Sequence, residues 1–288
     1  MDQLVTVSRD MIARKGIILR FRVIGSGSSG NATLVEEDGT RILIDAGLGP
    51  RELAERLQSA GVDPASLHGV FLSHEHHDHA RGARSFSRKW GVPVCGTEAT
   101  QWAAGLMDGI ARYEVLAVRT PRQVGALTVT GLPVPHDAVA PLAFVVSGGG
   151  ASLGHATDLG HVSRGLAQTF GTCDAILIES NYDPTMLTEG PYPWSLKERI
   201  LGPWGHLSNE DVARYLARGL GASCRTVVLA HLSEKNNHPE VARMWAEAAL
   251  RRGGRADVSL ELTRRDGTGW IDVTPVRRHA SGQQLKLW

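Results

Sequence analysis

Cysteine and long apolar runs are both scarce in this chain of 288 residues, and each scarcity excludes a class of protein. The three cysteines are widely spaced and odd in number, so they predict neither a disulfide framework nor a Cys-x-x-Cys zinc site. No apolar run approaches the roughly 20 residues of a membrane-spanning helix. Arg9, Arg14 and Lys15 interrupt the N-terminal apolar residues, which argues against a signal peptide. We therefore expect a cytoplasmic protein with reduced thiols and no membrane partner.

Neither sign of charge is in excess, since 31 Lys and Arg residues against 30 Asp and Glu residues give a formal net charge of +1. This balance does not decide whether the chain binds nucleic acid, because a local basic patch can exist within a neutral total. The length suffices for a large hydrophobic core. We find no linker, repeat or low-complexity segment. The sequence therefore predicts one domain at residues 20–274, with an N-terminal extension at 1–19 and a C-terminal tail at 275–288.

One short segment carries an unusual density of metal-binding side chains directly after the apolar run at 69–72, which is typical of a buried strand. These side chains are His74, His76, Asp78 and His79. Because side chains alternate faces along a strand, His74 and His76 would point the same way, and the other two would address a second point nearby. A solvated, histidine-rich loop is the alternative. The pattern His-x-His-x-Asp-His in this position favours two adjacent metal sites.

The rest of the chain alternates between strand-like and helix-like patterns, which predicts an α/β fold. Predicted strands lie at 20–24, 32–35, 41–45, 69–73, 92–95, 113–118, 124–130, 142–146, 151–156, 175–178 and 226–230. Predicted helices lie at 50–60, 80–90, 97–106, 212–220 and 239–251. The dipeptide Asp38-Gly39 is typical of a hairpin turn, and a terminal hairpin is expected across residues 265–268.

Several further acidic or histidine side chains also follow strand-like segments. These are His136, Asp158, Glu179 and His231. Pro133 and Pro135 stiffen the approach to His136, and a carboxylate at position 158 can place one oxygen on each of two cations. His206 precedes a helix whose first turn has the capping-box spacing of Ser208 and Asp211, so its position beside that helix is well defined.

The motif at 74–79, with a later His, Asp and His at strand ends, resembles the signature of the metallo-β-lactamase-fold hydrolases. The resemblance covers residues 20–274 and implies a four-layer αββα sandwich of two mixed sheets. It also implies two metals with a shared carboxylate. His74, His76 and His136 would hold one metal, Asp78, His79 and His231 would hold the other, and Asp158 would bridge them. With this ligand set complete, we expect His155 and His161 either to support the ligands from behind or to be structural, and His77 to be a loop residue.

Within that superfamily, further motifs resemble the WalJ/YycJ-type hydrolases. The motifs are Ser26–Asn31, Ala156–Asp158, Glu179–Asn181, Gly205–Asn209 and His231–Asn237. That family is associated with 5′-to-3′ exonuclease activity on DNA, so the resemblance implies a nucleic-acid substrate, with DNA favoured over RNA. Glu179 and His206 also match a Glu–His dyad beside the metals of tRNA 3′-processing endonucleases. Only about twenty residues separate Asp183 from His206, too few for the long tRNA-gripping arm of those enzymes.

The chemistry of two adjacent cations independently favours phosphodiester hydrolysis. Cations about 3.5–4 Å apart can hold a bridging hydroxide and clamp the phosphate oxygens. The leaving alkoxide needs a proton, which His206 oriented by Glu179 can supply, although a purely structural hydrogen bond between them is the alternative. We therefore predict Asp78, His206 and Glu179 as catalytic residues. The predicted cofactors are two divalent ions, zinc or manganese, with iron as an alternative.

Polar and basic residues near these motifs are candidates for contact with the substrate. The polar candidates are Ser26, Asn31, Asn181, Ser233 and Asn236. The basic candidates are Arg81, Arg84, Arg88, Lys89, Lys197, Arg199 and Lys235. The basic set predicts either a nucleic-acid groove or ordinary solvated helix faces. No feature of the sequence indicates an oligomeric state.

Other functions are compatible with the same ligands. An RNA-processing enzyme or a phosphodiesterase for small cyclic nucleotides would use the same metals on the same bond type. A glyoxalase II-like thioesterase is disfavoured, because the segment around His136 reads Pro-His-Asp-Ala and not Gly-His-Thr. A regulatory or scaffold protein that has lost catalysis is disfavoured by the complete ligand set.

Overall fold

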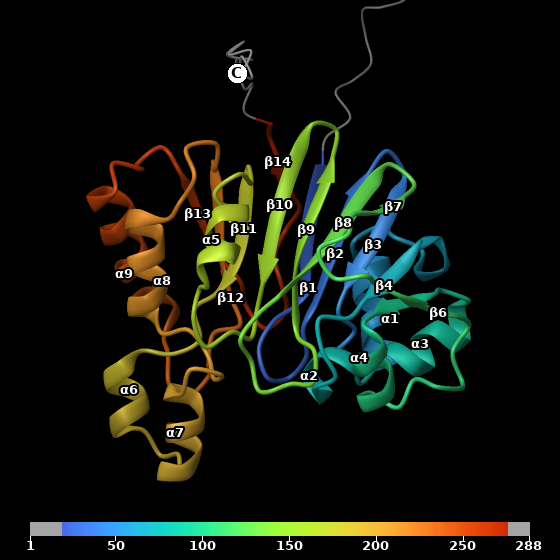
Figure 1. The fold of residues 1–288 in the computed structure, drawn as a ribbon, viewed down its shortest axis with the longest axis horizontal. Coiled ribbons are helices and arrows are strands. Elements are labelled where there is room, and N and C mark those ends of the chain that lie inside the picture. Colours follow the sequence, from blue (N-terminus) through green and yellow to red (C-terminus); the bar gives the residue numbers. More distant parts are fainter. Residues whose placement is uncertain (1–18, 276–288) are drawn as a thin grey trace, which may run out of the picture.

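Two β-sheets of seven strands each face one another in the computed structural model, and helices cover their outer faces (Figure 1). The structure describes residues 19–275. The predicted extension at 1–19 and tail at 275–288 lie outside the described residues, apart from Leu19 and Pro275. The predicted αββα sandwich of two mixed sheets is confirmed. Between residues 19 and 275, no helix is long and apolar enough to cross a membrane.

The first sheet combines antiparallel and parallel pairing. Its strands in spatial order are β14 (Ile271–Val273), β1 (Leu19–Gly25), β2 (Ala32–Glu37), β3 (Thr40–Ile44), β4 (Gly69–Phe71), β5 (Val94–Gly96) and β6 (Tyr113–Val115). β1 to β3 pair antiparallel, and β3 to β6 pair in parallel. The predicted hairpin between β2 and β3 is confirmed. Its turn residues Asp38 and Gly39 have φ values of 45° and 75°, a backbone that favours this dipeptide.

The second sheet has the same mixed character. Its strands in spatial order are β13 (Ser259–Leu262), β12 (Thr226–Ala230), β11 (Ala175–Glu179), β10 (Ala151–Ala156), β9 (Leu142–Gly148), β8 (Leu127–Pro133) and β7 (Arg122–Val124). β7 to β10 pair antiparallel, and β10 to β13 pair in parallel.

The helices form two outer layers and one outlying pair (Figure 1). Those beside the first sheet are α1 (Pro50–Ser59), a 3₁₀ turn (Pro64–Ser66), α2 (His77–Ala80), α3 (Ala83–Trp90) and α4 (Glu98–Ala103). Those covering the second sheet are α5 (Arg164–Phe170), α8 (Asn209–Arg218) and α9 (Pro239–Arg252). The outlying helices α6 (Pro184–Glu189) and α7 (Trp194–Leu201) lie beyond the lower edge of that sheet.

Central strands bury side chains on both faces, which explains their continuous apolar sequences. In β3, Ile42 and Ile44 join the core between the sheets, whereas Leu43 packs toward the helices outside the first sheet. Phe71 of one sheet meets Phe144 of the other edge-to-face, with ring centroids 6.2 Å apart. The sandwich is therefore held together by apolar layers on either side of each central strand.

Two predictions of local structure are wrong. β13 and β14 do not form the expected terminal hairpin, because β13 pairs with β12 in the second sheet and β14 pairs with β1 in the first. The helix predicted at 80–90 is divided into α2 and α3 around Gly82. A Cβ at Gly82 would lie 2.3 Å from the carbonyl oxygen of Leu48, so the chain passes too closely there for any larger residue. The sequence patterns also did not predict α5, α6 or α7.

Strand direction brings the polar strand ends together at the lower edge of Figure 1. β10, β11 and β12 run in parallel, so Asp158, Glu179 and His231 all emerge at one edge of the second sheet. β3 and β4 are also parallel, and they deliver Asp45 and the segment Ser73–His79 at the facing edge of the first sheet. The chemistry of the chain is therefore concentrated between the two sheet edges.

Candidate metal centre

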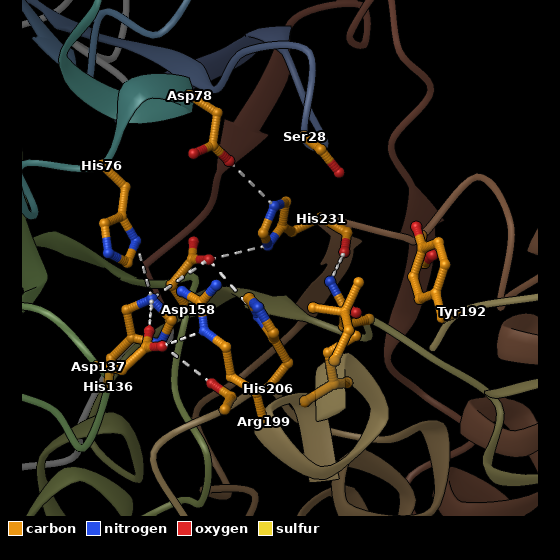
Figure 2. Close-up of a pocket in the computed structure, with 15 residues that line it drawn as sticks. Ser28, His76, Asp78, His136, Asp137, Asp158, Tyr192, Arg199, His206 and His231 are labelled. Carbon is orange, nitrogen blue, oxygen red and sulfur yellow. Dashed lines mark hydrogen bonds and ion pairs between the residues drawn. The ribbon is translucent and has the colours of Figure 1, made fainter. Parts of the chain in front are cut away.

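An open cavity of about 280 Å³ lies between these sheet edges and α7 (Figure 2). Its lining residues come from both sheets, from the loop after β8 and from the segment that contains α7. They are Ser28, His76, Asp78, His136, Asp137, Asp158, Asn181, Tyr192, Leu196, Arg199, Ile200, Gly205, His206, His231 and Ser233. His74 and His79 lie directly behind this surface and are almost fully buried.

The structure brings the seven predicted metal ligands into one cluster. His74, His76 and His136 offer nitrogen atoms that all lie within 4.8 Å of one another. A second group with the same closeness contains Asp78, His79 and His231. Asp158 shares a third group with His74 and His79, so its carboxylate lies between the two sets. Two cations held by these groups would be neighbours, with Asp158 in reach of both.

Distances within the cluster suit shared cations. The Nε2 atom of His136 and the Nδ1 atom of His76 are 3.3 Å apart. An oxygen of Asp158 lies 2.9 Å from Nε2 of His79. Nε2 of His231 lies 3.6 Å from an oxygen of Asp78, which itself is 3.5 Å from Nε2 of His79. Imidazole nitrogen and carboxylate oxygen together are the ligands that zinc, manganese and iron accept.

Two buried polar atoms in the cluster have no hydrogen-bond partner among residues 19–275. They are Nε2 of His74 and Oδ2 of Asp158. Oδ2 approaches His79 Nε2 closely, but without the geometry of a hydrogen bond. A buried polar atom without a partner costs about 1–3 kcal/mol, so such atoms are rare unless they bind something. The residues present therefore fit a divalent metal.

Several side chains orient the ligands from behind. The carboxylate of Asp45 accepts a hydrogen bond from Nδ1 of His79 at 2.8 Å, and it also accepts bonds from the backbone N–H and hydroxyl of Ser73. The amide of Asn31 lies 3.0 Å from Nε2 of His79 and donates to Asp78 at 3.3 Å. Such contacts fix the orientation of each ligand. Asp45 is not among the functional residues predicted from the sequence, although its place at the end of a predicted strand is a usable signal.

Glu179, the last residue of β11, contacts residues of three loops beneath the cavity. Its Oε2 atom lies 3.1 Å from Nδ1 of His206 and 3.3 Å from Nδ1 of His231. Its Oε1 atom accepts hydrogen bonds from the backbone N–H groups of Leu159 and Leu207. The Glu179 side chain is fully buried, whereas His206 reaches the cavity surface. The predicted proximity of these two residues is therefore present.

The helix after His206 begins as the sequence indicates. The hydroxyl of Ser208 accepts from the N–H of Asp211, and the Asp211 carboxylate accepts from the N–H of Ser208. The N–H of His206 donates to the carbonyl of Ile200 on α7. These contacts hold the imidazole between α7 and α8.

The backbone at three site residues adopts the left-handed region. Asp45, Asp158 and His231 have φ values of 62°, 61° and 53°. Each follows directly, or after one residue, the end of a strand, and the left-handed turn directs the side chain to the sheet edge. Asp and His tolerate this region better than most residues, but it still costs about 1–3 kcal/mol each. Such strain is common at functional sites.

Close backbone packing also shapes the motif loop. A Cβ at Gly47 would lie 1.6 Å from the carbonyl oxygen of Asp78. The N–H of Asn31 donates to that same carbonyl at 2.8 Å. Only glycine at position 47 allows the loop after β3 to support the loop that carries Asp78.

Carboxylates and imidazoles in the cluster strongly perturb each other. Burial alone would lower the pKa of His231, but Asp158, Asp78 and Glu179 raise it to about 10. Burial would raise the pKa of Glu179, but the neighbouring His206 lowers it to about 2. For His74, burial and the neighbouring His79 outweigh the opposing effect of Asp158, so its pKa lies well below the ordinary value. The fixed negative charges thus favour cationic occupants, either protons on the imidazoles or metal ions.

The predicted polar substrate contacts divide into two groups. Asn181 and Ser233 line the cavity. Ser26, Asn31 and Asn236 do not, because they are buried behind it. The hydroxyl of Ser26 accepts from the N–H of His231, and Asn31 supports the metal cluster, so their polar groups serve the protein itself. Ser28, which the sequence analysis did not select, lines the cavity instead.

The predicted basic groove is only partly present. Arg199 lines the cavity and pairs with Asp137, and Lys235 lies 5.6 Å above the ring of Tyr192. Lys197 is buried and donates to the carbonyl of Thr188, so its predicted role in a groove is wrong. Arg84 pairs with Asp108, away from the cavity lining.

Three further histidines for which the sequence predicted no metal-binding role are not among the seven proposed ligands. His155 is buried, and its Nε2 lies 3.1 Å from the hydroxyl of Thr33. His161 is exposed, with Nδ1 near the carbonyl of Pro203. His77 is exposed but begins α2, so its predicted loop conformation is wrong.

The chain is similar to proteins of one family. Residues 40–232 match the family described as the β-lactamase superfamily domain, which is more than half of the chain. The chain belongs to this superfamily. The crystal structure of the metallo-β-lactamase fold protein YhfI from Bacillus subtilis has the same fold, with a TM-score of 0.67. That similarity covers 86% of this chain and 97% of YhfI at 18% sequence identity.

Two curated relatives resemble the chain more narrowly. Exodeoxyribonuclease WalJ of Streptococcus pneumoniae serotype 2 is 34% identical over 232 residues, which is 78% of this chain and 86% of the relative. Exodeoxyribonuclease YycJ of Bacillus anthracis is 35% identical over 240 residues, 82% of this chain and 90% of the relative. The predicted resemblance to the WalJ/YycJ-type hydrolases is confirmed. The chain is a metal-dependent hydrolase of this fold.

Proposed function

We propose that this chain is a dinuclear metal-dependent phosphodiesterase that acts on DNA as a 5′-to-3′ exonuclease. The observation that carries the proposal is the position of His206 at the cavity surface, held by the buried Glu179 beside the seven-residue cluster. Two relatives named as exodeoxyribonucleases support the same substrate class.

The proposed ligands form two sets. His74, His76 and His136 would hold one divalent ion, Asp78, His79 and His231 the other, and Asp158 would contact both. When bound, a pair of zinc or manganese ions would polarise the phosphate and lower the pKa of water to about 7. Iron is an alternative with the same ligand preference.

His206 would donate the proton that the leaving oxygen requires. Its Nδ1 atom faces Glu179, so Nε2 is the nitrogen left to meet the substrate. Burial lowers the pKa of His206, but the charge and hydrogen bond of Glu179 raise it above the ordinary value, so the protonated form is favoured. General acids of this kind typically contribute about 10²–10⁴-fold in rate.

A panel of substrates tests the proposal. The purified protein, loaded with manganese or with zinc, would be offered 5′-phosphorylated DNA, RNA, a tRNA precursor, a cyclic nucleotide and a thioester. We expect DNA to be degraded from its 5′ end, and an Asp158→Ala variant to be inactive on every substrate. Cleavage of the thioester alone would overturn the nuclease function. Preference for RNA or for the cyclic nucleotide would overturn the assignment of DNA while leaving phosphodiester chemistry in place.

A further inference from the structure

The cavity has a second wall whose chemistry differs from that of the metal cluster. Tyr192, Leu196 and Ile200 line it from the segment that contains α7. In Figure 2, Tyr192 stands on the side of the cavity away from His76 and His136. An aromatic and two aliphatic side chains bind neither a divalent metal nor a phosphate, so this apolar wall offers a contact surface for another part of a ligand.

The apolar wall is not part of the sandwich core. Tyr192 and Leu196 pack on a small separate cluster of Tyr182, Leu187 and Ile200, distinct from the three apolar layers of the sheets. The Tyr192 side chain is only partly buried there. The ring therefore keeps part of its surface available for a ligand.

The wall is also held rigidly. Tyr192 lies between Pro191 and Pro193, whose rings restrict the backbone, and Pro193 directly precedes α7. The buried ammonium group of Lys197 on α7 donates to the carbonyl of Thr188 on α6 at 2.7 Å. A preorganised aromatic surface loses little entropy when a flat ligand stacks on it.

The positively charged side chain of Lys235 lies near the ring of Tyr192. Nζ of Lys235 lies 5.6 Å from the centroid of Tyr192, and Lys235 has no ion pair with a carboxylate within residues 19–275. An aromatic platform with a neighbouring unpaired cation, next to a phosphate-binding cluster, matches the parts of a nucleotide. The cavity volume of about 280 Å³ is close to the lower end of the range of small-ligand sites, roughly 300–1,000 Å³.

We propose that Tyr192 is the stacking platform for the base of the nucleotide removed by the enzyme, and that Lys235 neutralises an adjoining phosphate. The proposal rests on the proposed nuclease function. A terminal base that stacks on Tyr192 has left its partner strand, so a duplex end must open by at least one pair before cleavage. The wall acts through substrate positioning and takes no part in bond breaking.

The role of Tyr192 can be tested by comparing two forms of the protein on two forms of the substrate. Wild type and Tyr192→Ala would be compared on an oligonucleotide with a normal base, or a stable abasic residue, at the nucleotide removed first. Loss of the base should lower kcat/KM of the wild type about 5- to 150-fold, the range of base–aromatic stacking. In Tyr192→Ala the two substrates should be cleaved at nearly the same, reduced rate.

Matched variants separate stacking from damage to the fold. Tyr192→Phe keeps the ring and should keep the penalty for the abasic substrate. Trp194→Ala removes an exposed aromatic that lies outside the cavity lining, and it should also keep the penalty. Lys235→Gln should weaken binding equally for both substrates. It should also reduce the slope of log K against log salt concentration by about 1, as expected for the loss of one phosphate contact.

The outcomes distinguish this inference from the proposed function. If the wild type cleaves no nucleic acid, the nuclease function itself is wrong. If the wild type cleaves DNA but Tyr192→Ala shows the same abasic penalty, or the wild type shows none, the stacking role is wrong and the nuclease function stands. A preference of the wild type for thioesters with long acyl chains would assign the apolar wall to a different ligand.

Discussion

Asp45 holds His79 by a hydrogen bond of 2.8 Å between two side chains that are almost completely inaccessible to solvent. The carboxylate can only accept, so Nδ1 of His79 carries the proton and Nε2 is left to face the cluster. Ser73 donates twice to the same carboxylate, which prevents its rotation. The orientation of a proposed metal ligand is thus set by a residue about thirty positions earlier in the chain.

Replacement of Asp45 tests this support. We expect Asp45→Asn to weaken divalent metal binding about 10- to 100-fold, because the amide no longer fixes the tautomer of His79. Metal affinity would be measured by competition with a chromophoric chelator. Asp108→Asn, which alters a solvent-exposed carboxylate paired with Arg84, should bind metal as the wild type does. Equal metal affinity in Asp45→Asn would show that the hydrogen bond is not needed for orientation.

His206 should separate catalysis from metal binding. His206→Ala should lower kcat on DNA by about 10²–10⁴-fold while the metal content per chain stays unchanged. The reason is that the leaving group loses its proton donor while the seven proposed ligands remain. His161→Ala, at an exposed histidine outside the cavity, is the control. Loss of metal in His206→Ala would instead make His206 a ligand or a support of one.

Metal removal should destabilise the fold. A ligand present at a hundred times its Kd stabilises the native state by about 2.7 kcal/mol, so manganese should raise Tm and a chelator should reverse the increase. In Asp158→Ala the increase should be much smaller, since both ions lose a shared carboxylate. Differential scanning calorimetry with and without metal provides the measurement. An undiminished shift in Asp158→Ala would contradict the bridging role.

Replacement of Lys197 should lower the stability of the fold and leave the salt dependence of DNA binding unchanged. Lys197→Met keeps the aliphatic stem but removes the charged donor to Thr188, at a cost of about 1–3 kcal/mol. The salt dependence of DNA binding should match that of the wild type, because this ammonium group is buried away from the substrate. Chemical denaturation and binding titrations at several salt concentrations test both statements. A reduced salt dependence of DNA binding in Lys197→Met would show that Lys197 contacts the nucleic acid after all.

Glu36 should contribute stability only above acidic pH. Burial would raise its pKa, but hydrogen bonds from Arg41 and Arg20 lower the pKa in the folded state below the ordinary value of 4.5. Stability from this group is therefore fully present above pH 4.5 and is lost as the pH falls through the folded-state pKa. Glu36→Gln should lower the free energy of unfolding by about 1 kcal/mol at pH 7. Urea titrations should find a smaller difference at pH 3, and an equal difference at both pH values would contradict the linkage.

Much of the candidate site could be predicted from the sequence, because its residues lie at the ends of recognisable strands. The cluster His74–His79, Asp158 and His231 each follow apolar runs, and their types are restricted by ligand chemistry. The capping box at Ser208 likewise depends only on residues three positions apart. Local spacing carries such features, so they can be identified without knowledge of the fold.

Features that depend on distant partners could not be predicted. The sequence around β13 and β14 resembles that of a hairpin, yet β13 pairs with β12 in the second sheet and β14 pairs with β1 in the first. Lys197 has the sequence environment of a surface lysine, but the packing of α7 on α6 buries it. Nothing near Tyr192 in the sequence indicates that its ring lies across a cavity from His76.

The amino-acid sequence by itself thus determined the strand-end positions of the proposed ligands, the superfamily and the class of chemistry, because short-range spacing and side-chain type suffice for these. Only the tertiary structure decided that Asp45 supports His79, that Ser26 and Asn31 stand behind the cavity, and that an apolar wall faces the metal cluster. These relations join residues far apart in the chain, and the packing of two sheets and α7 sets their distances.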